Sequence, residues 1–357
     1  MNNDTRLPAT ATKPVFQLQD GFPAAYLNPV IATLALRAAN ADFKSPNMQQ
    51  WSFGVERDLP AGLQLELDYA GSKSTHLRYA FNLNQRIDGV RPYANFGVIT
   101  WFENYAAANY NGLEATVRRR FRDGLSLQAA YTFAKSIDDA GGENLTSNNS
   151  GSGQDSRDRA ANRAPSDMDI RHRFTAAYVY ELPFGEGKRF ASTGRLARVA
   201  GKFQMSGSMI FSSGRPFTVF ASSNDGAIDA SSYADLSGRP VLPQSVDCWF
   251  YSSASQRCRS VLPGAPNAFV DPRPGMFGNA GRNVLRGPGF ASVDMALQRE
   301  FSLSEKWRLL WRGEVFNVAN RAQFANPNSD IDNGAVGSIT RLAGDARVMQ
   351  FSLRVKF

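Results

Sequence analysis

Residues 347–357 read Arg-Val-Met-Gln-Phe-Ser-Leu-Arg-Val-Lys-Phe. Side chains along a β-strand point alternately to opposite faces, so a strand over this stretch has one apolar and one polar face. The apolar face carries Met349, Phe351, Leu353, Val355 and Phe357, and the polar face carries Gln350, Ser352, Arg354 and Lys356. The pattern predicts an amphipathic β-strand that ends on an aromatic residue.

The same alternation recurs along the chain. Further segments with this pattern are 51–56, 63–69, 113–118, 125–133, 173–182, 203–211, 293–298 and 307–315. An additional, more weakly patterned strand is expected around Tyr93–Phe102. The lengths suit tilted transmembrane β-strands of about 9–11 residues. We therefore expect an all-β fold, an antiparallel transmembrane β-barrel with about ten strands present, in which the apolar face meets lipid. A soluble β-sandwich is the alternative.

The composition agrees with this fold class. Mean hydropathy is slightly polar, and the longest apolar cluster, Val30–Leu36, is far shorter than the roughly 20 residues of a transmembrane helix. The net charge is +8, but the basic residues lie mostly on the polar register or at strand ends. Without a basic helix or an aromatic RNA-binding signature, no nucleic-acid partner is expected. A positively charged lumen or a phosphate-rich lipid surface explains the charge.

The connections between these segments alternate between short and long. Tight turns are expected at 59–62, 122–124 and 302–306, and Asp123-Gly124 is a strong hairpin signal. Long polar stretches cover 76–109, 137–170, 212–290 and 318–345. Transmembrane barrels have short periplasmic turns and long extracellular loops, so these four stretches are predicted to be extracellular. Residues 1–47 are expected to form an irregular lead-in, and residues 48–357 a barrel segment.

The strand count also places one long connection and three arginines at the periplasmic side. Counting strands back from a periplasmic Phe357 makes 183–200 a periplasmic connection, although it is long and rich in Gly, Lys and Arg. The same count places Arg57, Arg119 and Arg299 on the lipid-facing register at the periplasmic ends of strands. A charge costs only about 0–1 kcal/mol there, because a long side chain reaches the headgroups.

Several blocks in this order resemble one family. They are Ser45–Arg57, Asp68–Leu77, Asn109–Ala115, Ala130–Asp139, Asp167–Phe174, Glu181–Gly185, Gly214–Phe217 and Glu314–Asn320. Together they resemble the TonB-dependent, Oar-like outer-membrane receptors common in Acidobacteria, and the resemblance covers roughly Gly21–Phe357. Family members carry a signal peptide, a carboxypeptidase-regulatory-like domain and a plug domain before a barrel of the 22-stranded class. This chain resembles only the C-terminal portion of that barrel.

The resemblance implies a location and a set of partners. The chain is expected in the outer membrane, surrounded by its lipids, with a role in taking up an unidentified ligand. The TonB complex would act through a plug domain that has no counterpart here, and the last strand, Met349 to Phe357, would be the address for the barrel-assembly machinery. Because residues 1–5 lack signal-peptide features, we expect the C-terminal part of a longer precursor, with an open edge at its first strand. An adhesion or surface-display protein is the alternative.

Candidate site residues follow from the strand register. The residues expected to face the lumen are Glu66, Asp68, Arg118, Arg120, Gln128, Arg173, Glu181, Arg308, Arg312, Arg354 and Lys356. Cys248 and Cys258 lie close together in one long loop. An oxidising compartment favours a disulfide between them, whereas two free thiols would fit a cytosolic protein.

No enzymatic activity, cofactor or metal is predicted. His76 and His172 fall near the loop ends of strands, as do Asp138, Asp139, Asp167 and Asp169, so a water-activating Asp–His pair of a rim protease is conceivable. Such groups are more commonly solvated loop residues. The histidines and cysteines do not form a zinc pattern, and segment 328–334 lacks the closing Glu of a calcium loop.

Overall fold

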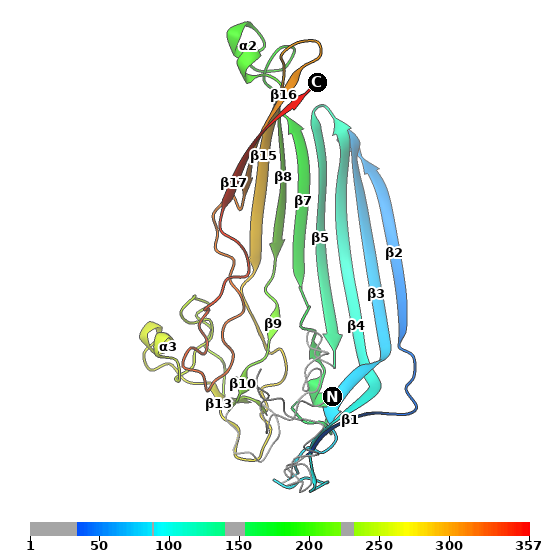
Figure 1. The fold of residues 1–357 in the computed structure, drawn as a ribbon, viewed down its shortest axis with the longest axis vertical. Helices are drawn as coiled ribbons and strands as arrows, with labels where there is room; N and C mark the ends of the chain where they lie inside the picture. Colours follow the sequence, from blue (N-terminus) through cyan, green and yellow to red (C-terminus); the bar gives the residue numbers. More distant parts are fainter. Residues whose placement is uncertain (1–33, 88, 140–153, 223–231) are drawn as a thin grey trace, which may run out of the picture.

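A large antiparallel sheet organises the computed structural model, which describes residues 34–87, 89–139, 154–222 and 232–357 (Figure 1). Nine of its 11 strands follow one another in the order β17-β16-β15-β8-β7-β5-β4-β3-β2, while β1 pairs with β4 and β6 pairs with β5. The strands of the main path are β2 (Asn47–Leu59), β3 (Leu63–Asn82), β4 (Phe96–Arg122), β5 (Leu125–Asp138), β7 (His172–Glu181), β8 (Phe203–Ser212), β15 (Phe290–Ser302), β16 (Arg308–Phe316) and β17 (Val348–Lys356).

The two ends of the sheet differ. At the end that we call the turn end, uppermost in Figure 1, strands are joined by short turns and by the connection that contains α2 (Gly194–Ala200). The predicted Asp123-Gly124 hairpin is confirmed: Arg122 pairs with Leu125, and the intervening residues have φ of 52° and 80°. Positive φ at both central positions is the geometry of a two-residue hairpin turn. The opposite end, the loop end, carries the long connections.

Cross-strand register gives the sheet two chemically distinct faces. The pairing aligns Leu67, Ala115, Tyr131, Phe174 and Phe211 across five strands. We call this side the apolar face and the opposite side the polar face. On β17 the apolar face is open, with Phe351 69% and Leu353 68% exposed. A row of large exposed apolar side chains is what a lipid-facing barrel surface requires. Among the described residues, no helix has the length and apolarity needed to cross a membrane.

The long connections fold into a packed layer at the loop end, which sequence patterning did not predict. We call residues 154–171, 213–222, 232–289 and 317–346 the loop layer. It contains η3 (Ala160–Asn162), β6 (Ala164–Pro165), β9 (Pro216–Phe217), β10 (Phe220–Ala221), β11 (Ser232–Tyr233), β12 (Asp235–Leu236), α3 (Gln256–Val261), β13 (Phe269–Val270) and β14 (Leu285–Arg286). Its core buries Phe217, Val219, Ala221, Ala234, Phe250, Phe269, Ala280, Leu285, Ile331 and Val336.

Two boundaries expected at the loop end are wrong. The strand expected around Tyr93–Phe102 is not separate, because residues from Phe96 onward form the first part of β4. The connection expected at 76–109 is mostly strand, since β3 continues to Asn82. Both strands exceed the roughly 9–11 residues that cross a bilayer. They continue because they pair with each other beyond that length, with register shifts between Ser74 and Tyr79.

The lead-in expected at residues 1–47 also contains regular structure. Within it, β1 (Leu34–Ala39) pairs in parallel with the start of β4. Backbone hydrogen bonding to an existing strand orders this segment without any need for strict alternation. Residues 1–33 lie outside the described residues.

The assignment of the two faces predicts opposite effects for neighbouring residues of β8. Met209→Arg puts a charge on the apolar face and should lower the free energy of unfolding by about 2–4 kcal/mol. The matched control Ser208→Arg lies on the polar face, paired with Asp294, and should change it by only about 0.5 kcal/mol. Guanidinium titration of the chain folded in detergent micelles measures both. Equal losses would contradict the assignment.

Candidate functional site

Charged side chains pair with one another along the polar face. Arg118 lies 3.1 Å from Glu66, between β4 and β3. At the other edge of the sheet Glu300 lies 3.1 Å from Arg308 and 3.3 Å from Lys356. Arg312 bridges strands by donating to Gln298 at 3.0 Å, and it lies 2.7 Å from Glu314. These charges compensate one another and keep partial exposure, so the polar face can stay in contact with water.

The residues expected to face the lumen, apart from Arg120, fall on the polar face by strand alternation. Pairings of Arg118 with Gln128, of Glu181 with Gln204 and of Arg308 with Lys356 show the shared register. Asp68, Arg173 and Arg354 have the same parity on their strands, whereas Arg120 lies at a register shift between Arg119 and Arg122. Their role in lining a lumen stays a prediction.

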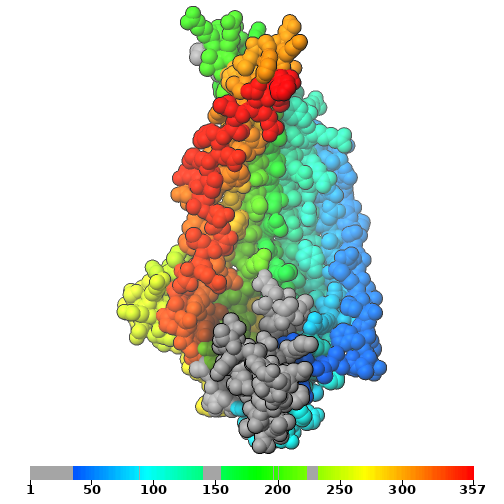
Figure 2. Space-filling view, viewed as in Figure 1, coloured from blue at the N-terminus to red at the C-terminus, as the bar shows by residue number. Residues whose placement is uncertain are grey.

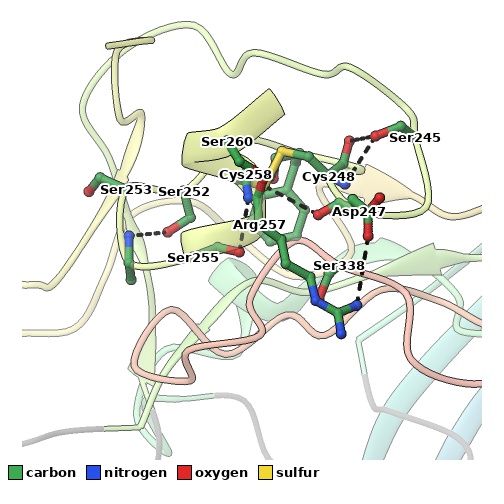
Figure 3. The surroundings of a disulfide bond; sticks show 12 residues. Ser245, Asp247, Cys248, Ser252, Ser253, Ser255, Arg257, Cys258, Ser260 and Ser338 are labelled. Carbon is green, nitrogen blue, oxygen red and sulfur yellow. Dashed lines mark hydrogen bonds and ion pairs between the residues drawn. A yellow bond between two sulfur atoms is a disulfide. The ribbon is translucent and has the colours of Figure 1, made fainter. Parts of the chain in front are cut away.

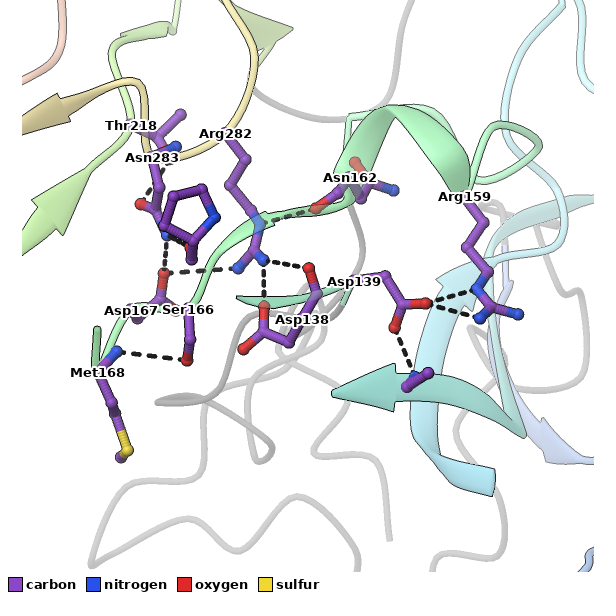
Figure 4. A network of polar contacts seen from close by, with 12 residues as sticks. Asp138, Asp139, Arg159, Asn162, Ser166, Asp167, Met168, Thr218, Arg282 and Asn283 are labelled. Atoms are coloured by element: carbon purple, nitrogen blue, oxygen red, sulfur yellow. Dashed lines mark hydrogen bonds and ion pairs between the residues drawn. The ribbon is translucent and has the colours of Figure 1, made fainter. Parts of the chain in front are cut away.

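Arg282 joins the loop layer to the sheet (Figure 4). Its guanidinium forms an ion pair with Asp138 at the end of β5 and donates to the Asn162 carbonyl at 3.0 Å. It also lies 3.5 Å from an Asp167 carboxylate oxygen. The Arg282 and Asp138 side chains are only 8% and 12% exposed. A buried charge needs a partner of opposite sign, so this contact fixes how the layer sits on the strand ends.

A second arginine of the same segment makes a parallel contact. Arg286 forms an ion pair with Asp169 and also donates to the Gly214 carbonyl at 3.2 Å. The other carboxylate oxygen of Asp169 accepts from the Ser136 N–H at 2.7 Å. Asp139 extends the network, accepting from the Ala107 N–H and pairing with an arginine, each at 2.7 Å. The carboxylates at the end of β5 and before β7 are thereby engaged in structural contacts.

We call these contacts between the loop layer and the strand ends the junction. Neutral polar groups also take part in it. The Tyr233 hydroxyl donates to Asn162 Oδ1 at 3.2 Å, and Asn162 Nδ2 donates to the Tyr79 hydroxyl at the same distance. Burial raises the pKa of Tyr233 to about 12, so its hydroxyl stays protonated and able to donate at neutral pH. Buried Gln154 accepts from the Tyr233 N–H at 2.9 Å and donates to the Gly278 carbonyl at 2.6 Å.

Cys248 and Cys258 form a disulfide in the loop layer (Figure 3). Both are fully buried and pack with Tyr251. Ser255 caps the short helix α3 by accepting from the Cys258 N–H. The bridge thus joins a loop to a helix beside the apolar core of the layer.

The structure does not place His172 with the carboxylates of the junction. His172 lies on the apolar face, where Nδ1 is 2.8 Å from the Tyr131 hydroxyl and the ring packs 5.1 Å from Phe133. Asp138 points instead to the polar side, toward Arg282. The described residues contain no group of three or more His, Cys, Asp or Glu side chains suited to holding a metal.

Sequence reasoning singled out the carboxylates of this junction but missed their partners. Arg282 and Arg286 lie four residues apart in the stretch Gly281-Arg-Asn-Val-Leu-Arg-Gly287. Two arginines flanked by glycines in a long loop could have indicated cationic partners for these carboxylates. Their pairing with particular aspartates could not be read from the sequence, because the partners are separated by 117 and 144 positions.

Comparison with known proteins gives a family match. The model of a family described as "Outer membrane beta barrel domain" matches residues 2–350. No curated protein matches the chain.

Solved structures with a similar arrangement of strands include an outer membrane transporter and two receptors. The outer membrane transporter YddB from Escherichia coli is 11% identical with a TM-score of 0.48, and the alignment covers 91% of this chain and 34% of that one. The ferripyoverdine receptor of Pseudomonas aeruginosa is 14% identical with a TM-score of 0.42, covering 87% and 27%. The siderophore receptor PiuA from Acinetobacter baumannii is 11% identical with a TM-score of 0.42, covering 87% and 28%. The chain therefore spans about a third or less of these structures.

Removing the buried cation tests the junction. Arg282→Met leaves Asp138 buried without its partner and should lower the free energy of unfolding by about 3–5 kcal/mol. Arg257→Met is the control, because that arginine and Asp247 are 55% and 64% exposed at 3.8 Å, and its loss should cost at most about 1 kcal/mol. Chemical denaturation in micelles gives both values. Similar costs for the two variants would refute the structural role of Arg282.

Removing the disulfide tests the loop layer. The double variant Cys248→Ser/Cys258→Ser should lose about 3 kcal/mol, because the bridge closes a short loop. Trypsin should then cleave faster after Arg257 and Arg259 in α3. A reducing agent added to the unaltered protein should reproduce this faster cleavage. An unchanged cleavage rate would show that packing alone holds the segment.

Proposed function

We propose, because this chain belongs to the outer membrane beta barrel domain family, that it forms part of the wall of a ligand-uptake receptor of the TonB-dependent type. The single observation that supports this function most is the polar face, on which charges pair from Glu66 and Arg118 at one side to Glu300 and Lys356 at the other. A barrel wall that served only as a membrane anchor would not need ion pairs at both sides of its polar face.

The position and the packing of the loop layer also support this proposal. With extracellular loops and periplasmic turns, the layer would stand at the outer mouth and the polar face would lead inward from it. Its junction is held by Arg282 and Arg286, so a ligand would meet a preformed surface. The TonB complex would act through a plug domain, and the barrel-assembly machinery through β17. Met349, Phe351, Leu353, Val355 and Phe357 would form that assembly signal.

A surface-display or adhesion protein is the second candidate. The observation that favours it is the packed core and disulfide of the loop layer, which supply a rigid binding surface whether or not anything passes through the barrel. The two functions differ in whether the polar face of the sheet takes part in binding.

Retention of small molecules distinguishes the two functions. The purified chain in detergent micelles is incubated with the small-molecule fraction of spent culture medium, and retained compounds are identified by mass spectrometry. A receptor should retain a compound, and Arg118→Gln/Arg312→Gln on the polar face should reduce retention roughly tenfold, as expected for losing two charge-assisted contacts. The control Arg57→Gln/Arg119→Gln changes the same charge on the apolar face and should leave retention unchanged. Folded protein that retains nothing, or equal losses in both variants, would contradict the receptor function.

A further inference from the structure

The connection between β7 and β8, residues 183–202, is folded closely against the turn end. Leu182 N–H donates to the Phe203 carbonyl at 2.8 Å, which joins the two ends of the connection. Phe190 N–H donates to the Pro183 carbonyl at 3.0 Å. Gly185 and Gly201 approach so closely that a Cβ on Gly185 would lie 2.5 Å from the Gly201 Cα. The connection is therefore an ordered structure, and in Figure 2 it projects beyond the strands.

Arg299 tethers this connection to the apolar face. Its guanidinium donates to the carbonyls of Arg198 and Val199 in the last turn of α2, where a cation is favourable. It also lies 5.1 Å from the Phe203 ring and 4.4 Å from the Phe301 ring. Phe203 and Arg299 are paired across β8 and β15, so α2 is held beside the surface that meets lipid.

The connection is strongly basic. It contains Lys188, Arg189, Arg195, Arg198 and Lys202 against the single acidic residue Glu186, a net charge of five minus one, or +4. Lys188 is partly compensated by Glu181 at 3.0 Å. Apolar groups are exposed beside these charges, and Val199 in α2 is 68% exposed. Exposed apolar groups mixed with Lys and Arg are typical of segments that lie in a membrane interface.

A pocket of about 630 Å³ lies between the connection and the turn ends of β8, β15, β16 and β17. Five basic residues and three acidic residues line it, and so do the aromatic rings of Phe203 and Phe301; the charged residues are Lys188, Arg198, Lys202, Arg299 and Lys356, and Glu181, Glu186 and Glu300. The volume is in the usual range for a site that holds a small ligand. Lys188 and Lys356 are compensated by Glu181 and Glu300. Arg198 and Lys202 line the pocket together with Phe203 and Phe301, whose side chains belong to the apolar face. This combination matches a ligand with an anionic head and apolar tails.

We propose that the basic connection, with Arg198 and Lys202 at the edge of this pocket, binds the headgroup of an anionic phospholipid. The phosphate would lie near Arg198 and Lys202, and the acyl chains would continue along the apolar face past Phe203 and Phe301. Arg299 is a positioning residue, because it holds α2 in place. This inference goes beyond ligand uptake and does not depend on it.

Lipid retention tests the proposal on the full chain. The protein in dodecylmaltoside micelles receives equal mole fractions of phosphatidylglycerol or phosphatidylcholine, and native mass spectrometry counts the retained lipids. Phosphatidylglycerol should be retained severalfold more than phosphatidylcholine. Arg195→Gln/Arg198→Gln/Lys202→Gln should reduce its retention roughly tenfold or more, because each basic residue near an anionic surface adds to the attraction.

The control changes the same charge at the loop end. Lys44→Gln/Lys73→Gln/Lys135→Gln should retain phosphatidylglycerol as the unaltered chain does. All three lysines are exposed, and they lie before β2, within β3 and near the loop end of β5, outside the connection. Equal retention of both lipids by the unaltered chain would overturn the proposal. So would an equal loss in the control, or displacement of the lipid by excess inorganic phosphate, which would indicate a general anion site.

A labelled variant keeps the test decisive if the triple variant does not fold. Both native cysteines are joined in the disulfide, so Val199→Cys provides one reactive thiol for a polarity-sensitive fluorophore. Its emission should shift to the blue with phosphatidylglycerol and much less with phosphatidylcholine. The same emission with both lipids would contradict the proposal.

Discussion

Backbone hydrogen bonding in a medium without water is the constraint on which this structure depends. Each N–H and C=O within a bilayer needs a partner from the protein itself, and the antiparallel ladders from β2 to β17 supply those partners along nine consecutive strands. Once the pairing of the strands is fixed, alternation decides to which face of the sheet each strand side chain points. A slip of one residue would move Phe351 and Leu353 to the polar face and Arg354 to the lipid. Register and environment therefore specify each other.

The arginines show how the desolvation cost of a charged side chain differs between the polar face, the loop end and the apolar face. On the polar face Arg118 and Arg312 find carboxylate partners while they keep contact with water, so their desolvation is small. At the loop end Arg282 is buried, and it persists because Asp138 and backbone carbonyls surround it. On the apolar face Arg299 lies at the turn end, where carbonyl groups and aromatic rings receive it. One residue type thus serves three environments through different partners.

The sequence predicted those parts of the fold that depend on local periodicity. Alternation located the strands, and Asp123-Gly124 located a turn, because both signals are contained within a few residues. The loop layer was missed because its core joins Phe217, Phe250 and Ile331 from distant segments that each look polar on average. The strand expected around Tyr93–Phe102 was not recognised as the first part of β4 for a related reason, since residues 103–112 are held in the strand by pairing with β3 and β5 rather than by a clear alternating pattern.

The candidate site likewise has one part that the sequence predicted and one part that it did not. The residues of the polar face could be listed from parity alone, because the side to which a side chain points follows from its place in its own strand. The junction could not, because Arg286 and Asp169 meet only after the sheet has brought their segments together. The loop layer therefore depends on the sheet for its position, whereas the strands need only one another. This order of dependence argues that variation in the long connections can change the surface of the loop layer while the ladder beneath it stays intact.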